Sequence, residues 1–103
     1  MPISSNDTES QGVTDTVRNN TTLHRFELDA DGATSFASYR LADGVVVITH
    51  VETPDQLRGR GIASKLVDGA LQIIRADGHK VIGQCSFARA YLARHSEFSD
   101  LLA

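Results

Sequence analysis

The residues best suited to chemistry form a short run of arginines and glycines, Arg58-Gly59-Arg60-Gly61. The run follows an apolar segment and leads into residues with helical periodicity, which predicts a glycine-rich turn between a strand and a helix. Backbone N–H groups in the first turn of a helix lack intrahelical acceptors, and the helix dipole is positive there. Glycine lets the backbone approach an anion closely, and arginine adds positive charge. The turn therefore predicts a phosphate-binding site.

Three further side chains could act as a base or a nucleophile. His50 and Glu52 stand at the end of the apolar segment before the turn, and Cys85 ends a second β-prone segment. Histidine has the ordinary pKa best suited to a base near neutral pH, and a cysteine thiolate is a nucleophile. Simpler interpretations stay open, because His50 and Glu52 could be solvated surface groups and Cys85 a small buried side chain.

The composition limits the partners that this chain can have. Its 103 residues, 41% of them hydrophobic, suit one small domain, and the apolar runs are shorter than the roughly 18 residues that a membrane span needs. The net charge of −3 disfavours nucleic acid as a partner. With a single cysteine and no signal-like start, we expect a soluble cytoplasmic protein. His24, His79 and His95 have no metal-ligand spacing, so we expect no metal site.

Residues 1–22 are rich in polar side chains and predict a disordered tail, which leaves residues 23–103 as the domain. Three β-prone segments follow, at residues 23–28, 33–41 and 45–51. Asp-Gly pairs separate them, so they predict a three-stranded antiparallel meander.

An amphipathic helix is predicted after the turn, because apolar residues recur from Ile62 to Ile74 at intervals of three and four. Asp77-Gly78 ends this helix, and residues 79–84 form a fourth strand. A strand, a long helix and a second strand imply a right-handed crossover, so the last two strands should run parallel. A short helix at residues 86–94 and a final apolar turn complete an α+β domain.

This order of elements and the segment Arg58-Gly59-Arg60-Gly61-Ile62-Ala63 resemble the GNAT family of acetyl-CoA-dependent N-acetyltransferases, whose signature is Arg/Gln-x-x-Gly-x-Gly/Ala. More specifically, the chain resembles a short single-domain GNAT-like group that lacks the usual N-terminal helices. This group carries a histidine late in one strand and a cysteine after the next, here His50 and Cys85. The resemblance covers residues 23–102 and implies a minimal GNAT-like fold.

The resemblance implies that acetyl-CoA binds at the turn, with its amide-rich arm between two strands that splay apart. The residues expected to bind it are Thr53, Arg58, Gly59, Arg60, Gly61, Ile62, Ala63 and Ser64. The same resemblance implies catalytic roles for His50 and Cys85, the latter as an acetyl carrier or only as a packing residue. Tyr91 stands near the position of the family's thiol-protonating tyrosine, but the residues after it depart from the family pattern.

The expected function is therefore transfer of an acetyl group from acetyl-CoA to an amine of a small molecule or a protein, by a monomer or a weak dimer. Two alternatives stay open. One is a non-catalytic module that binds acetyl-CoA or CoA, since the absent N-terminal helices would remove much of the acceptor-binding wall. The other is a different phosphate or nucleotide binder, because a glycine-rich helix start accepts many anions.

Overall fold

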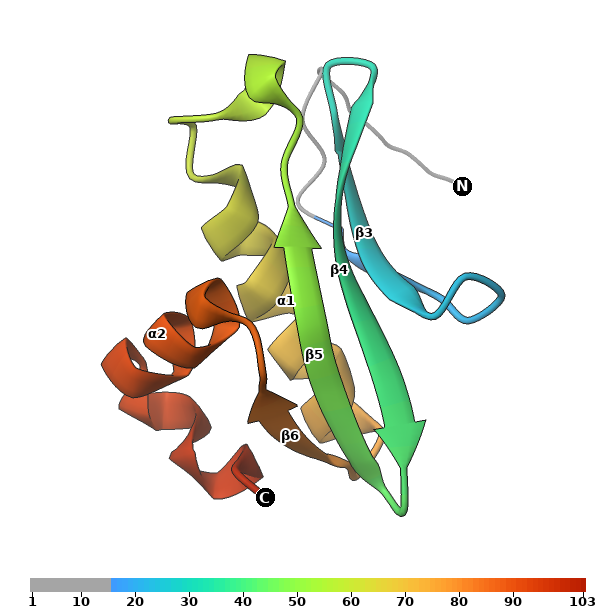
Figure 1. Ribbon diagram of the computed structural model, residues 1–103, viewed down its shortest axis with the longest axis vertical. Coiled ribbons are helices and arrows are strands. Elements are labelled where there is room, and N and C mark those ends of the chain that lie inside the picture. The colour runs from blue at the N-terminus through green and yellow to red at the C-terminus, as the bar shows by residue number, and fades with distance from the viewer. Residues whose placement is uncertain (1–15) are drawn as a thin grey trace, which may run out of the picture.

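The computed structural model describes residues 16–103, which form one five-stranded sheet with a long helix packed behind it (Figure 1). The strands are β2 (Arg18–Asn20), β3 (Arg25–Ala30), β4 (Ala33–Ala42), β5 (Val45–Glu52) and β6 (Lys80–Gly83). The helices are α1 (Ile62–Ala76) and α2 (Ser86–Arg94), with 3₁₀ turns at Asp55–Leu57 and Ser96–Leu101. Within residues 16–103, no helix is long and apolar enough to cross a membrane.

The strands lie in the sheet in their order along the chain, from β2 to β6. Neighbours are antiparallel as far as β5, whereas β5 and β6 are parallel and are connected through α1. The predicted meander, crossover helix and parallel strand are therefore confirmed. Both Asp-Gly turns have left-handed backbones at each residue, as tight hairpins between twisted strands require, with φ of 48° and 79° at Asp31 and Gly32.

The core lies between α1 and the sheet. The buried stripe of α1 includes Leu66, Val67 and Leu71, and the sheet contributes Phe26 and Ile48, all in one hydrophobic cluster. Burying large aliphatic and aromatic side chains stabilises a fold by about 1.5–3 kcal/mol each. This stripe therefore fixes α1, and with it the glycine-rich turn, against the strand that precedes it.

The first strand, β2, corrects the predicted tail. Residues 1–15 lie outside the described part of the chain, but Arg18–Asn20 pair with β3 inside the predicted tail of residues 1–22. Glu27 of β3 is buried and accepts a hydrogen bond from Asn20 at 3.1 Å. Burial alone would raise the pKa of Glu27, but hydrogen bonds from Arg25, Asn20 and Arg18 hold it below its ordinary value. The domain therefore begins before residue 23.

Val17, just before β2, packs directly on α1 at Gly69. A Cβ added to Gly69 would lie 2.3 Å from Cγ2 of Val17. We therefore predict that Gly69→Ala destabilises the protein by about 1–3 kcal/mol, as overpacked sites do. In a Val17→Gly background the same change should stabilise it by up to about 1 kcal/mol, because alanine is the better helix former. Urea unfolding of the four proteins measures this reversal of sign, and a stabilising effect in both backgrounds would contradict the packing.

Candidate active site

The edge between β5 and β6 opens after Ile48. Pairing of the two strands ends at Ile48 and Gly83, and the N–H groups of Gln84 and Cys85 both donate to the Ile48 carbonyl, at 2.9 and 3.3 Å. The chain then turns into α2, while β5 continues to Glu52. The splay predicted between the parallel strands is therefore present at their carboxyl ends.

A β-bulge at the same point decides which way the last residues of β5 point. Tyr39 of β4 pairs with Ile48 and Ser38 pairs with His50, so Thr49 is the extra residue. Partners in a ladder lie on the same face, and Ile48 is fully buried on the core face. In a regular strand His50 would share that face. The bulge turns it to the opposite one.

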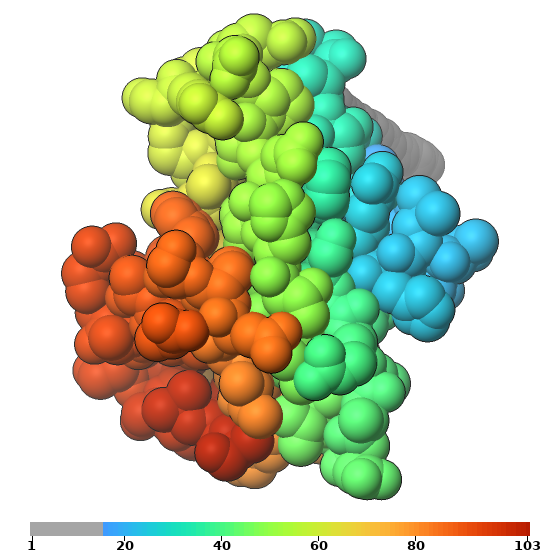
Figure 2. Space-filling model, viewed as in Figure 1, coloured from blue at the N-terminus to red at the C-terminus, as the bar shows by residue number. Residues whose placement is uncertain are grey.

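His50 and Glu52 pair on this outer face. His50 Nε2 lies 3.0 Å from Glu52 Oε1, and both side chains are 58% exposed. A proton on Nε2 donates to the carboxylate, which leaves the lone pair on Nδ1 and makes Nδ1 the basic atom. In Figure 2, β4 and β5 form an open surface between α2 and β3, so nothing described covers this face of the sheet there.

Two adjoining hollows lead from this pair to the glycine-rich turn. The strand hollow, about 540 Å³, is lined by His50, Val51, Glu52, Thr53, Pro54, Asp55, Arg58, Ala63 and Phe87. The turn hollow, about 240 Å³, is lined by Thr53, Leu57, Arg58, Gly59, Gly61, Ile62, Ala63, Ser64 and Phe87. Four residues line both: Thr53, Arg58, Ala63 and Phe87. The two hollows therefore adjoin along these four residues, and together they are called the groove below.

The glycine-rich turn has the geometry of an anion site. Gly61 caps α1 in the left-handed conformation, with φ of 73° and no side-chain capping bond, and Gly59 has φ of 78°. The N–H groups of Ile62, Ala63 and Ser64 precede the first helical hydrogen bond and have no intrahelical acceptor. A Cβ at either glycine would meet no described atom within 4 Å outside its chain neighbours. The space beside both glycines is therefore empty, as the close approach of a phosphate to the turn requires.

The two arginines of the turn differ in their surroundings. Arg58 lines both hollows and pairs with the exposed Asp55 at 3.3 Å. Arg60 lines neither hollow and forms an ion pair of 2.5 Å with Asp31 in the turn between β3 and β4. Arg60 therefore fastens the glycine-rich turn to the sheet, and Arg58 is the arginine placed to meet a ligand.

The comparison with known proteins accounts for this arrangement. Residues 25–101 match the family model of the GCN5-related N-acetyl-transferases. The chain belongs to the GCN5-related N-acetyltransferase family. Its fold is similar to the solution structure of a GCN5-like protein from Staphylococcus aureus, with a TM-score of 0.65 and 26% identity, over 84% of this chain and 86% of that one. Among curated proteins, none is significantly similar in sequence.

Cys85, the second catalytic candidate of this family member, has a different hydrogen-bond partner from His50. Its Sγ accepts a hydrogen bond from the Ala88 N–H at 3.4 Å, which makes it the N-cap of α2. Cys85 is not among the described residues that line either hollow. The partner of His50 is Glu52. The structure thus gives the two predicted catalytic residues different partners and does not show the hypothesised pair between them.

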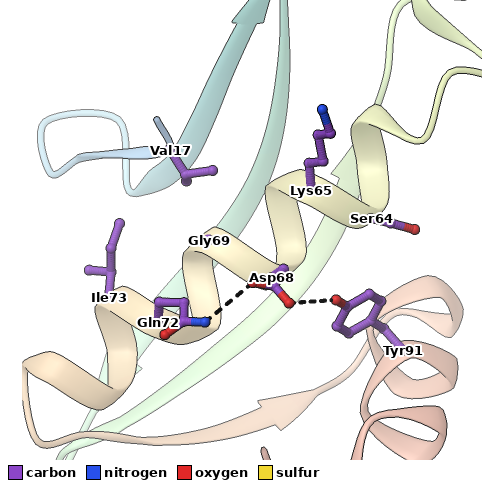
Figure 3. Close-up of a pocket in the computed structure, with 8 residues that line it drawn as sticks. All are labelled: Val17, Ser64, Lys65, Asp68, Gly69, Gln72, Ile73 and Tyr91. Carbon is purple, nitrogen blue, oxygen red and sulfur yellow. Dashed lines mark hydrogen bonds between the residues drawn. The ribbon is translucent and has the colours of Figure 1, made fainter. Parts of the chain in front are cut away.

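The hydroxyl of Tyr91, the family's candidate acid, is hydrogen-bonded to another side chain of the protein. Its hydroxyl donates to Asp68 Oδ2 of α1 at 2.9 Å, and the two residues lie in a separate hollow on the surface of α1 (Figure 3). Burial, followed by the hydrogen bond and the charge of Asp68, raises the pKa of Tyr91 to about 12. Tyr91 thus joins α2 to α1 through Asp68, and it is not among the residues that line either hollow of the groove.

Two residues of the site escaped the sequence analysis. Phe87 lines both hollows from the first turn of α2. The sequence indicates only an apolar side chain in a helix at this position, so nothing in it marks Phe87 as a residue of the site. Ser35 is fully buried on β4 and bonds to the end of β5. The signal that could have identified Ser35 is its polar side chain at a core-facing position of a strand. No metal cluster of three or more His, Cys, Asp or Glu side chains occurs within residues 16–103.

The conformation of Gly61 gives a prediction for stability. A β-branched residue is strained at φ of 73°, whereas asparagine tolerates the left-handed region. We expect Gly61→Val to lower the free energy of unfolding by about 1–2 kcal/mol and Gly61→Asn by less than half as much. Urea titrations measure both values. Equal losses in the two variants would contradict backbone strain as the cause.

Proposed function

We propose that this family member transfers an acetyl group from acetyl-CoA to an amine of a small molecule or a protein. The observation that carries the proposal is that the hollow at the glycine-rich turn and the hollow at the His50–Glu52 pair adjoin and share four lining residues. Membership of the GCN5-related N-acetyltransferase family supports acyl transfer as the reaction.

The turn suits the pyrophosphate of acetyl-CoA. The N–H groups of Ile62 to Ser64 and the positive end of the α1 dipole favour an anion, and Arg58 lies where it can add a charge-assisted hydrogen bond. The amide-rich arm would then follow the strand hollow along β5 beyond Ile48, where pairing with β6 has ended. This course brings the thioester toward His50.

His50 is proposed as the general base. Nδ1 takes the proton of the bound ammonium, and the neutral amine nitrogen then attacks the thioester carbon and loses its second proton to water. Glu52 holds the imidazole in the required tautomer. The carbon–sulfur bond then breaks. A thiol has an ordinary pKa near 8.5, so the thiolate is a good leaving group and takes its proton from water. The proton held by Tyr91 is not needed in this sequence of steps.

Direct attack by the amine is favoured over a covalent acetyl intermediate on Cys85. The position of Cys85 as the N-cap of α2, at the end of the strand beside β5, is what supports a covalent route. However, Cys85 is half-buried and lies outside the groove lining, whereas His50 lines the strand hollow.

The acceptor enters from the open face of β4 and β5, where the carboxylate of Glu52 favours a cationic amine.

Binding of the acyl donor is the first test. We expect wild-type protein to bind acetyl-CoA and Gly61→Val to bind it at least tenfold more weakly, because the added side chain occupies the phosphate site. Arg60→Ala should weaken binding by less than about threefold, because an exposed ion pair already engages this charge. Titration calorimetry with acetyl-CoA, CoA and ATP measures these affinities. No binding of any CoA species, or a preference for ATP, would overturn the proposal.

Turnover is the second test. With an amine acceptor found by a CoA-release screen, His50→Ala should lower kcat by about 10²–10⁴, the usual contribution of a general base. Cys85→Ala should stay within about threefold of wild type, and protein incubated with acetyl-CoA alone should show no added acetyl group in an acid-quenched intact mass spectrum. An adduct that disappears in Cys85→Ala would establish the covalent route. Acetyl-CoA binding without turnover of any amine would favour the non-catalytic module.

A further inference from the structure

The end of β5 is held by a buried hydroxyl pair. Ser35 of β4 is fully buried, and its Oγ lies 2.9 Å from the carbonyl oxygen of Glu52 and 2.9 Å from Oγ1 of Thr53. Glu52 carries the carboxylate that pairs with His50, and Thr53 begins the loop that leads to the glycine-rich turn. One serine thus connects the core to both parts of the groove.

The two contacts of Ser35 assign the hydroxyl protons. A hydroxyl has one proton and two lone pairs, and a carbonyl oxygen can only accept. The proton of Ser35 therefore goes to the Glu52 carbonyl. The Ser35 oxygen must then accept in its other contact, so the proton of Thr53 points at Ser35. Both bonds form together only in this direction.

Because its proton is used in the bond to Ser35, Thr53 Oγ1 can act toward a ligand in the groove only as a hydrogen-bond acceptor. It is half-buried and lines both hollows, at the place where they join. Its proton is directed at Ser35, so the lone pairs of Oγ1 are what this hydroxyl can offer to a ligand. A phosphate diester has only acceptor oxygens and gains nothing from such a group, whereas an N–H donor does.

We propose that Thr53 Oγ1 accepts a hydrogen bond from an amide N–H in the arm of the acyl donor, and that Ser35 is the positioning residue that sets this polarity. The inference rests on the proposed function, because the arm must pass Thr53 on its way from the glycine-rich turn to His50. It narrows the predicted role of Thr53 from cofactor binding in general to recognition of the amide arm. Binding of the phosphates is then the role of the glycine-rich turn.

Calorimetry with two probes tests this assignment. CoA contains both the phosphates and the amide arm, whereas adenosine 3′,5′-bisphosphate contains phosphates without the arm. Thr53→Val keeps the shape of the side chain and removes the hydroxyl. It should weaken CoA binding by about three- to tenfold, the effect of one hydrogen bond, and leave the bisphosphate within twofold of wild type. Thr53→Ser, the matched control, should bind both probes within twofold of wild type.

A double-mutant cycle tests the role of Ser35. Ser35→Ala should weaken CoA binding in the wild-type background and should weaken it much less in Thr53→Val, because the part of its effect that acts through Thr53 is then already lost. Thermal melts of each variant establish that it is folded. Unchanged CoA binding in folded Thr53→Val, or equal losses for CoA and the bisphosphate, would overturn the inference while the proposed function stands. A wild-type protein that binds no CoA would overturn both.

Discussion

The β-bulge at Thr49 is the constraint on which the candidate site depends. Because side chains alternate along a strand, a single extra residue exchanges the two faces for everything that follows it. Ile48 packs in the core, yet His50 and Glu52 both reach the open face, where their side chains pair. Val51 takes the inward position and packs against the core. A regular strand would have buried the imidazole and left the groove without a base.

The groove is built from segments that different contacts hold in place. The buried stripe of α1 fixes the helix behind the sheet, and the ion pair of Arg60 with Asp31 fastens the turn at its start. Ser35 anchors the last residue of β5. The groups that make these contacts lie on β3, on β4 and in the turn between them. The meander therefore buries a core and also holds the segments of the groove in position. It also holds the proposed phosphate site and the proposed base, which lie on either side of one loop.

Much of this arrangement was predictable from sequence because it follows local rules. Asp-Gly turns, the helical stripe and the glycines of the turn each report a backbone conformation directly. The bulge does not, because it depends on the register between β4 and β5 and leaves no mark in composition. β2 was missed for a related reason: Arg18–Asn20 is entirely polar, and its place in the sheet comes from partners around the buried Glu27. The partners of His50 and Cys85 likewise depend on the three-dimensional structure, because neither Glu52 beside His50 nor the Ala88 N–H at Cys85 follows from the sequence pattern.

The exposure of the His50–Glu52 pair has a consequence for how such a site would recover between reaction cycles. A base that removes one proton per cycle must release it before the next substrate arrives. In deeply buried sites this release needs a chain of waters or side chains. Here 58% of each side chain is open to solvent, so bulk water and buffer reach the imidazole directly. Proton exchange with the medium, and not relay through the protein, would return His50 to its neutral form.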